Sequence, residues 1–517
     1  MYINNKILIG KSEDKELAIL LDKANRHGLI TGASGSGKTI TSKVMAESFS
    51  DAGIPVFMAD VKGDMAGTAI CGEQNENVDN RVNKLGLTDF EYKAFPVRFW
   101  DIFGEKGHPI RTTLDSVGPE ILSMMLGLTE AQEGVLTVVY KIAKDNEWEL
   151  DDIKDLRLLL QYVGDNREQF TTAYGNVTTQ SVGVIQRCLL ALENQGANQF
   201  FGQPELDIND FLSVDANGKG MINILHAVRL FESPDLFASF LLWLLTSLYT
   251  KMPEVGDLDK PKMVFFFDEA HLLFNGMPEY RLKRIVQVVR LIRSRGIGLY
   301  FISQSPADIP GDIIAQLGNR VQHNLRAYTP TELRTVKAAA DSFRANPKFD
   351  TYDSILNLGT GEALISFQNE NGEPEVVEKA TILPPQSKMG TIDEISRQKV
   401  INSSNLLGKY DEAIERESAY EEIDELNRLV KEKIEAEAAA KEEEKQRIAD
   451  EKAAEKQAKL DEKAKKEEER AAEKKKREEE KAKKNSFEYK MGKKVANAAT
   501  NKLINKGLNK LFKGIFK

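Results

Sequence analysis

The sequence of 517 residues predicts an α/β fold, in which a parallel sheet with a helical insertion is followed by a long charged helix. Up to about residue 400, short apolar runs alternate with helical patterns, as in chains that build parallel sheets. These runs lack the polar–apolar alternation of half-exposed strands, which is typical of strands buried on both faces. The predicted strands cover residues 28–31, 54–59, 221–225, 263–267 and 297–303.

Between about residues 112 and 215 the apolar pattern is helical instead. Val135, Val138, Val139 and Ile142 recur at spacings of three and four, which places them on one face of a helix. We interpret this stretch as a helical insertion between strands. The predicted domains are therefore 1–400, which contains the insertion at about 112–215, a long mixed-charge helix at 405–484, and a basic amphipathic tail at 485–517.

The composition excludes several classes of protein. Asp and Glu number 80 and Lys and Arg number 71, so a globally basic protein that coats nucleic acid is excluded. Two cysteines, Cys71 and Cys188, are too few for a disulfide framework, which favours a reducing compartment. The longest apolar run, 236–249, is shorter than the roughly 20 residues that cross a bilayer, and it predicts a buried helix. We expect a cytoplasmic protein.

The charged segment after residue 405 predicts a solvated single helix. Of the 54 residues from 431 to 484, 19 are basic and 18 are acidic, and the apolar a and d positions of a coiled coil are missing. Acid–base pairs at i,i+4 stabilise an isolated helix. A disordered charged linker is the alternative. The pairs are Glu437/Lys441, Glu455/Lys459, Glu462/Lys466 and Glu480/Lys484.

A glycine-rich segment follows the first of the predicted buried strands and precedes a predicted helix. It fits the pattern G-x-x-x-x-G-K-[ST], in which glycines let backbone N–H groups turn toward phosphates. The helix N-terminus favours anions as well. We expect ATP and Mg²⁺ as cofactors, with Lys38 reaching the β- and γ-phosphates and Thr39 holding the metal. The predicted nucleotide-binding residues are Gly32, Ala33, Ser34, Gly35, Ser36, Gly37, Lys38 and Thr39.

A second motif places two carboxylates directly after the apolar run 263–267. Asp268 is predicted to bind Mg²⁺, and Glu269 to act as the general base that polarises the attacking water. An acidic strand-to-helix turn is the alternative for this pair. Paired with the phosphate loop, the motif predicts a P-loop NTPase fold of the type found in RecA-like ATPases.

Polar residues beside other predicted strands complete the candidate site. Gln304 ends the run 297–303 and is predicted to sense the γ-phosphate or to orient the water, with an ordinary loop amide as the alternative. Asp60 ends a strand and either faces the ligand crevice or forms a turn before Gly63. Arg293 and Arg295 are candidates for an arginine finger that reaches a neighbouring subunit, or they only complement a helix C-terminus.

With these motifs, the chain resembles the HerA-like P-loop ATPases, which are relatives of the FtsK-type ring translocases. It is most similar to a short bacterial branch that lacks the N-terminal barrel of HerA proper. The resemblance covers about residues 5 to 390. It is carried by Asn25-Arg26-His27-Gly28, Asp60-Val61-Lys62-Gly63-Asp64, the segment 265–274 with its Asp-Glu-Ala-His, Gln316-Leu317-Gly318-Asn319-Arg320-Val321-Gln322-His323, and Pro384-Pro385-Gln386-Ser387.

The resemblance implies a hexameric ring that hydrolyses ATP and moves along double-stranded DNA, often with a nuclease partner. Lys38, Asp60, Glu269, Gln304 and Arg293 fall on the ATPase motif positions of that family. The family therefore implies catalytic or nucleotide-binding roles for these residues, a homo-oligomer and a DNA partner. The missing barrel and the mixed-charge helix are departures from HerA proper.

The last predicted segment is a basic amphipathic helix. Lysines at 502, 506, 510, 513 and 517 alternate with apolar residues at 504, 508, 511 and 515, which separates a basic face from an apolar one. Such a helix binds an anionic membrane, a partner protein or nucleic acid, or docks back on its own ring.

Three functions remain open on the sequence alone. The first is a ring ATPase motor acting on DNA, and the second is a remodelling ATPase that acts on protein or peripherally at a membrane. The third is a slow ATP-dependent switch, against which Glu269 argues because it supplies a general base.

Overall fold

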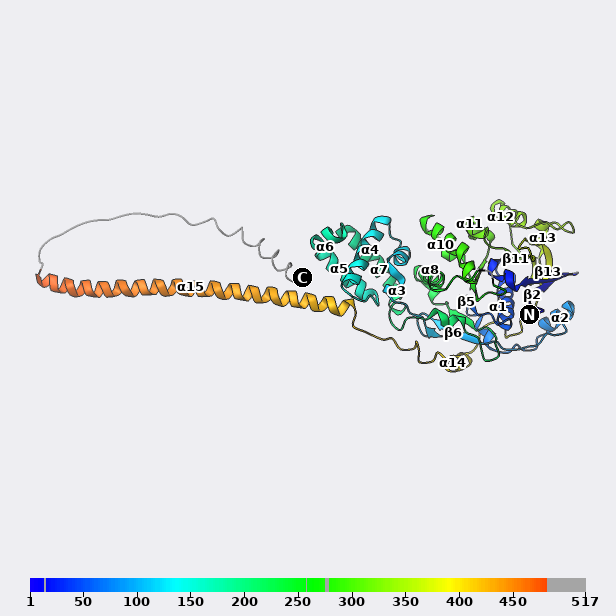
Figure 1. Ribbon diagram of the computed structural model, residues 1–517, viewed down its shortest axis with the longest axis horizontal. Helices are drawn as coiled ribbons and strands as arrows, with labels where there is room; N and C mark the ends of the chain where they lie inside the picture. The colour runs from blue at the N-terminus through cyan, green and yellow to red at the C-terminus, as the bar shows by residue number, and fades with distance from the viewer. Residues whose placement is uncertain (14, 257, 275–278, 481–517) are drawn as a thin grey trace. The chain divides into compact units, whose positions relative to one another are not determined.

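The computed structural model describes residues 1–13, 15–256, 258–274 and 279–480. Contacts within the chain divide it into two units, Met1–Asn427 and Arg428–Lys517. The first unit is built on one large sheet (Figure 1). The domain boundaries near residues 400 and 485 stay predictions, and the predicted basic tail at 485–517 lies outside the described residues.

The sheet has 13 strands and confirms the predicted α/β fold. Neighbouring strands from β11 to β7 are parallel, whereas the strands from β12 to β1 pair in antiparallel fashion. In sheet order the strands are β1 (Tyr2–Ile3), β2 (Lys6–Lys11), β13 (Glu378–Ile382), β12 (Glu362–Ser366), β11 (Asn319–Gln322), β4 (Gly28–Thr31), β10 (Ile297–Ser303), β9 (Met263–Phe267), β5 (Val56–Asp60), β8 (Ile222–His226), β6 (Val97–Asp101) and β7 (His108–Pro109), with β3 (Glu16–Leu20) paired to β2.

Both faces of the parallel strands are buried, which explains their continuous apolar sequences. On β9, Phe265 and Phe267 pack into one core cluster, whereas Val264 and Phe266 pack into a second cluster on the opposite face. Phe49 of the helix α1 belongs to the second cluster. The sheet is therefore sandwiched between helices. Outside the insertion these are α1 (Lys38–Asp51), α2 (Glu76–Leu85), α8 (Pro234–Lys251), α9 (His271–Phe274), α10 (Glu279–Ile292), α11 (Gly311–Ile314), α12 (Pro330–Asp341), α13 (Thr351–Asn357) and α14 (Glu394–Asn402).

The stretch predicted as a helical insertion contains the helices α3 to α7 (Figure 1). Leu122, Leu159 and Leu189 from this stretch belong to the same core cluster as Phe265 of the sheet. The insertion therefore shares one continuous hydrophobic core with that face of the sheet. Its helices are α3 (Leu114–Leu126), α4 (Glu130–Asp145), α5 (Ile153–Asp165), α6 (Arg167–Tyr174) and α7 (Thr179–Asn194).

The apolar run 236–249 lies within α8, whose side chains are largely buried against the same core, as predicted. Within the described ranges, none of the helices combines the length and the apolar character that spanning a bilayer requires.

The long helix α15 (Ala419–Glu480) begins later than the predicted start at residue 405. Residues 403–418, which we call the strap, run instead as turns and extended chain along the first unit. Specific contacts override the helical propensity of the strap. Arg111 donates to the carbonyl of Tyr410 at 2.7 Å, and Ile414 N–H donates to the carbonyl of Gln203 at 3.0 Å. Tertiary contacts of this kind routinely outweigh local preference.

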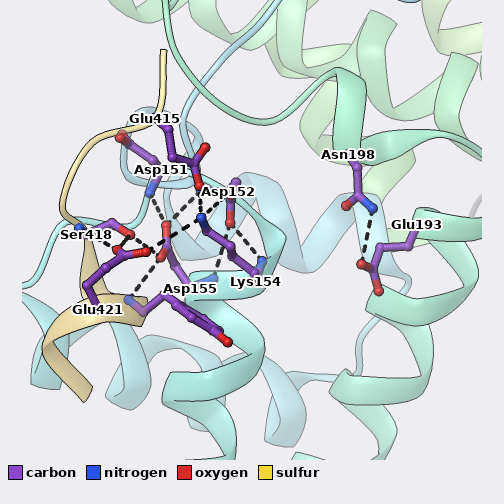
Figure 2. Close-up of polar contacts among 10 residues, drawn as sticks. Asp151, Asp152, Lys154, Asp155, Glu193, Asn198, Glu415, Ser418 and Glu421 are labelled. Atoms are coloured by element: carbon purple, nitrogen blue, oxygen red, sulfur yellow. Dashed lines mark hydrogen bonds and ion pairs between the residues drawn. The ribbon is translucent and has the colours of Figure 1, made fainter. Parts of the chain in front are cut away.

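The strap ends where α15 meets the start of α5 (Figure 2). Asp155 is fully buried there. Its Oδ2 accepts the N–H groups of Asp151 and Asp152 at 2.8 and 3.0 Å, which caps α5. Its Oδ1 accepts the Ser418 hydroxyl at 2.5 Å and the Tyr420 N–H at 3.1 Å. One carboxylate thus holds the N-termini of both helices.

Among the described side chains of α15, the buried apolar ones lie in its first turns. Ala419 and Ile423 are fully buried in the core cluster of the insertion, whereas Ile434 is 59% exposed and Leu460 is 53% exposed. The predicted ion pair between Glu455 and Lys459 forms at 2.6 Å. From Arg428 to the last described side chains, the helix carries its polar residues in solvent.

Candidate active site

The predicted functional motifs meet at the carboxyl edge of the parallel strands. The glycine-rich loop follows β4, the acidic pair follows β9, and Gln304 follows β10. Strand β10 lies between β4 and β9, with Ser303 opposite Thr31 and Phe301 opposite Phe267. Open α/β sheets bind ligands at this edge.

The glycine-rich loop has the backbone expected for binding phosphates. Gly35 and Gly37 have φ values of 77° and 118°, which a residue with a side chain rarely adopts. Lys38 is only 7% exposed, and its Nζ donates to the carbonyls of Gly32 at 2.6 Å and Ala33 at 3.2 Å. Burial, with Lys62 nearby, lowers the pKa of Lys38, although Glu269 and Asp268 oppose the shift.

Residues that flank β11 and β12 hold the loop through backbone hydrogen bonds. Ala33 N–H donates to the carbonyl of Asn324 at 2.8 Å, and Gly361 N–H donates to the carbonyl of Ser36 at 3.1 Å. His323 Nδ1 donates to the carbonyl of Glu362 at 2.9 Å, which leaves Nε2 to accept the Thr41 hydroxyl at 2.9 Å. Burial lowers the pKa of His323 to about 4, so it is a neutral structural link between α1 and β12.

The loop fits the phosphates of a nucleotide. The Ser36 hydroxyl is buried and makes no hydrogen bond within the described residues. A Cβ added at Gly35 would meet nothing within 4 Å, so the loop is open at this point. An unpaired buried hydroxyl beside backbone N–H groups and a lysine matches an anionic ligand. Thr39, in the first turn of α1, and Asp268 carry the oxygen ligands that Mg²⁺ prefers.

The acidic pair after β9 occupies a strained and largely buried turn. Glu269 has a φ of 49° and is 6% exposed. Such a backbone in a residue with a side chain costs about 1–3 kcal/mol and is typical of functional sites. Burial raises the pKa of Asp268 to about 6, opposed by Lys62 and reinforced by Glu269.

Two basic side chains lie beside the Glu269 carboxylate. Lys62 Nζ is 3.2 Å from Oε1, and His271 Nδ1 is 3.4 Å from Oε2. Oε2 is buried and makes no hydrogen bond within the described part of the chain. One oxygen of the Glu269 carboxylate is therefore held by Lys62, and the other is buried without a hydrogen bond among the described residues.

Asp60 ends β5 and closes the turn that carries Lys62. Its Oδ1 accepts the N–H of Gly63 at 2.8 Å, and its Oδ2 accepts the N–H of Met65 at 3.0 Å. Burial raises the pKa of Asp60 to about 6, with Asp64 adding to the shift. Both oxygens are engaged within the turn, which agrees with the turn interpretation. A direct role of Asp60 in nucleotide binding stays a prediction.

Gln304 is exposed at the end of β10, in a shallow pocket with His271, Ser305 and Asp308. Asp308 anchors this segment, because its Oδ2 accepts the Ser303 hydroxyl at 2.6 Å and the Ser305 N–H at 2.9 Å. The amide of Gln304 is therefore presented toward solvent from a fixed turn.

The two candidate finger arginines lie at the opposite edge of the sheet. They immediately precede β10, whereas the phosphate loop follows the carboxyl end of the parallel β4. Arg295 donates to the carbonyl of Met252 at 2.9 Å and lies over the Tyr249 ring at 5.2 Å. Arg293 lies near His27, at the start of β4. Neither arginine is placed to reach the phosphate loop of its own chain.

The sequence missed the contacts that organise this edge. Lys62 lies in a motif quoted above, but its ion pair with Glu269 spans 207 residues of sequence. The link between His323 and Thr41 spans 282 residues. The local signal for the contact of Lys62 with Glu269 is a lysine just after one strand, beside a neighbouring strand that ends in two acidic residues. The contact of His323 with Thr41 has no local signal in the sequence.

Comparison with known proteins gives a consistent assignment. The family described as "Helicase HerA-like C-terminal" matches residues 5–514. The chain is 23% identical over 378 residues to the DNA double-strand break repair helicase HerA of Sulfurisphaera tokodaii, covering 71% of this chain and 67% of the relative. It is also 23% identical over 372 residues to the protein of that name from Pyrococcus furiosus, covering 66% and 63%. The chain thus spans about two thirds of the length of these relatives.

Among solved structures, the plasmid coupling protein TrwB in complex with a non-hydrolysable GTP analogue has a TM-score of 0.48 at 14% identity, covering 73% of this chain and 90% of TrwB. VirB4 of Thermoanaerobacter pseudethanolicus has a TM-score of 0.46 at 16% identity, covering 77% and 99%. The family match extends over nearly the whole chain, and the phosphate loop and the acidic pair lie within it. The chain belongs to the HerA-like helicase C-terminal family.

Proposed function

We propose that this chain hydrolyses ATP at the carboxyl edge of β4, β9 and β10, and that it does so as a ring motor acting on duplex DNA. The observation that carries the proposal is the meeting of the Lys38 loop and the acidic pair, Asp268 and Glu269, at one edge of the sheet. Lys38 feels the charges of both carboxylates, which supports a single site.

We assign a separate role in hydrolysis to each residue of the site. The loop N–H groups and Lys38 bind and orient the phosphates. Thr39 and Asp268 would hold Mg²⁺, which when bound neutralises charge on the phosphates. Glu269 accepts a proton from the attacking water, and its free Oε2 suits this role. Gln304 orients the water or senses the γ-phosphate from the end of β10.

The position of the arginines supports an oligomer. Because Arg293 lies at the edge opposite its own phosphate loop, a role in hydrolysis requires a second copy of the chain. We favour Arg293 over Arg295 as the finger, since Arg295 is held by Met252 and Tyr249. A hexamer is the proposed ring, on the resemblance to HerA-like ATPases.

Duplex DNA is the proposed polymer substrate because the curated relatives are named as DNA repair helicases. Two basic side chains of α10 that could contact DNA are already neutralised by ion pairs. Lys283 pairs with Glu279 at 2.8 Å, and Arg284 pairs with Glu120 at 2.5 Å. A remodelling ATPase that acts on protein or peripherally at an anionic membrane is therefore retained as the alternative.

The deciding experiment is steady-state ATP hydrolysis by the purified chain alone, with duplex DNA, and with anionic liposomes, using Lys38→Ala as the blank. Stimulation by DNA alone supports the motor. Stimulation by liposomes alone, lost when residues 485–517 are deleted, favours the remodelling ATPase. Turnover no higher than the blank under all three conditions contradicts hydrolysis.

A further inference from the structure

Lys62 is the basic side chain in closest contact with the predicted general base. Its Nζ lies 3.2 Å from Oε1 of Glu269. The carboxylate is 8% exposed and Lys62 is 50% exposed, so the pair joins a buried acid to a cation that reaches in from solvent. A buried carboxylate needs such a partner to remain ionised.

The turn that carries Lys62 is held by hydrogen bonds to Asp60. Asp60, which is 2% exposed, accepts the N–H groups of Gly63 and Met65 and so closes the loop around Lys62. The turn follows β5, the direct neighbour of β9 in the sheet. The ammonium and the carboxylate are therefore delivered by two adjacent, rigid strands.

The charges around Lys62 favour its cationic form. Burial lowers its pKa, but Asp268, Glu269 and Asp64 outweigh this effect and the net shift is upward. Lys62 also offsets the repulsion between like charges, because Asp268 and Glu269 are adjacent residues that both interact with it. Without the ammonium, two neighbouring carboxylates would share a partly buried turn.

The contact engages one oxygen and leaves the other available. Oε1 faces Lys62, whereas Oε2 makes no hydrogen bond within the described residues and lies 3.4 Å from His271 Nδ1. Glu269 also has a strained φ of 49°, which is typical of residues at functional sites. A general base needs this combination of fixed orientation and a free lone pair.

We infer that Lys62 is a positioning residue for hydrolysis, whose ammonium holds Oε1 of Glu269 so that Oε2 faces the attacking water. The inference rests on the proposed ATPase function. Lys62 acts through Glu269 and not as a ligand of the nucleotide, so it affects kcat and leaves the KM for ATP unchanged.

The test measures kcat and KM for ATP on the full chain with Lys62→Met, Lys62→Arg, Glu269→Gln and the double variant Lys62→Met/Glu269→Gln. We expect Lys62→Met to lower kcat by about tenfold or more, part of the 10²–10⁴-fold that a general base contributes, with KM within about twofold. Lys62→Arg keeps the cation and should recover most of the loss. The double variant should be no slower than Glu269→Gln alone, since residues that act as one unit are not additive.

A matched control is Lys93→Met. Lys93 also pairs with a mostly buried carboxylate, Asp51 at 2.7 Å, but at the far end of α1 from the phosphate loop. This variant should keep the wild-type kcat. A thermal unfolding curve and binding of a fluorescent ATP analogue verify that each variant is folded and binds nucleotide.

Four results would overturn the inference: a wild-type or raised kcat in Lys62→Met, a raised KM with unchanged kcat, a further loss in the double variant, or no recovery in Lys62→Arg. The proposed function fails separately, if the wild-type chain hydrolyses no more ATP than Lys38→Ala. That result removes the inference as well, whereas wild-type turnover that survives Lys62→Met removes the inference alone.

Discussion

The junction of α5 and α15 and the candidate active site are both built on buried carboxylates, but they satisfy them differently. Asp155 accepts four hydrogen bonds, two on each oxygen, from the N-termini of two helices (Figure 2). Glu269 is also buried, at 6% exposed against 0% for Asp155, yet one of its oxygens makes no hydrogen bond within the described residues. The carboxylate with a structural role accepts hydrogen bonds on both oxygens, whereas the one with a proposed chemical role has one oxygen without a hydrogen bond.

The largest expected effect is the loss of kcat when Glu269 is replaced. Glu269→Gln removes the proton acceptor and should lower kcat by about 10²–10⁴-fold, with only a small change in stability because the glutamine keeps an amide oxygen that can accept from Lys62 Nζ. Single-turnover ATP hydrolysis and thermal unfolding measure the two effects. Glu394→Gln, an exposed acid paired with Lys106, is the control that should change neither. A Glu269→Gln variant within threefold of wild type would contradict the assignment.

Asp155, which accepts hydrogen bonds on both oxygens, should show the opposite result: its loss should lower stability and leave kcat unchanged. Asp155→Ala leaves the N–H groups of Asp151, Asp152 and Tyr420 without their acceptor, while the Ser418 hydroxyl keeps Glu421 as its other acceptor, at an expected loss of about 3 kcal/mol of unfolding free energy. Denaturant unfolding measures the loss. The neighbouring Asp152→Ala removes an ordinary helix cap and should cost about 1 kcal/mol. Equal losses for the two variants, or a lower kcat per folded molecule in Asp155→Ala, would break the comparison.

A third prediction concerns pH. Burial raises the pKa of Asp268 from 3.8 to about 6. Between pH 4 and 6 the folded chain keeps this proton while the unfolded chain has lost it, so this group's contribution to the unfolding free energy falls as the pH rises. Without Mg²⁺, Asp268→Asn should therefore be more stable than wild type by about 3 kcal/mol at pH 7 and equal to it near pH 4. A stability difference independent of pH would disprove this account.

The smallest effect is expected for an exposed carboxylate. Glu455 pairs with Lys459 on the solvated part of α15, with both side chains about two-thirds exposed or more. Glu455→Gln should cost no more than about 0.5 kcal/mol of local helix stability, an effect that added salt reduces. Circular dichroism at 222 nm in low and high salt measures it. A loss as large as that of Asp155→Ala would show that exposure does not govern these carboxylates.

The local patterns of the sequence predicted the parallel sheet, the phosphate loop and the acidic pair, because each depends on a few consecutive residues. The contacts that organise the site could not be predicted in this way. Lys62 meets Glu269 across 207 positions, and Ser418 meets Asp155 across 263. The start of α15 was predicted at 405 because the strap is polar and charged like the helix after it. Its contacts with the insertion, invisible in a local pattern, move the start to Ala419.

The strap also adds to the attachment of the insertion. An inserted segment is joined covalently to its fold at two points, where the chain enters and where it leaves, and this one also shares a hydrophobic core with one face of the sheet. The strap ties the start of α5 to the chain that follows α14, which adds a polar attachment. The root of α15 is therefore anchored to the insertion by the contact of Ser418 with Asp155 as well as by the burial of Ala419 and Ile423.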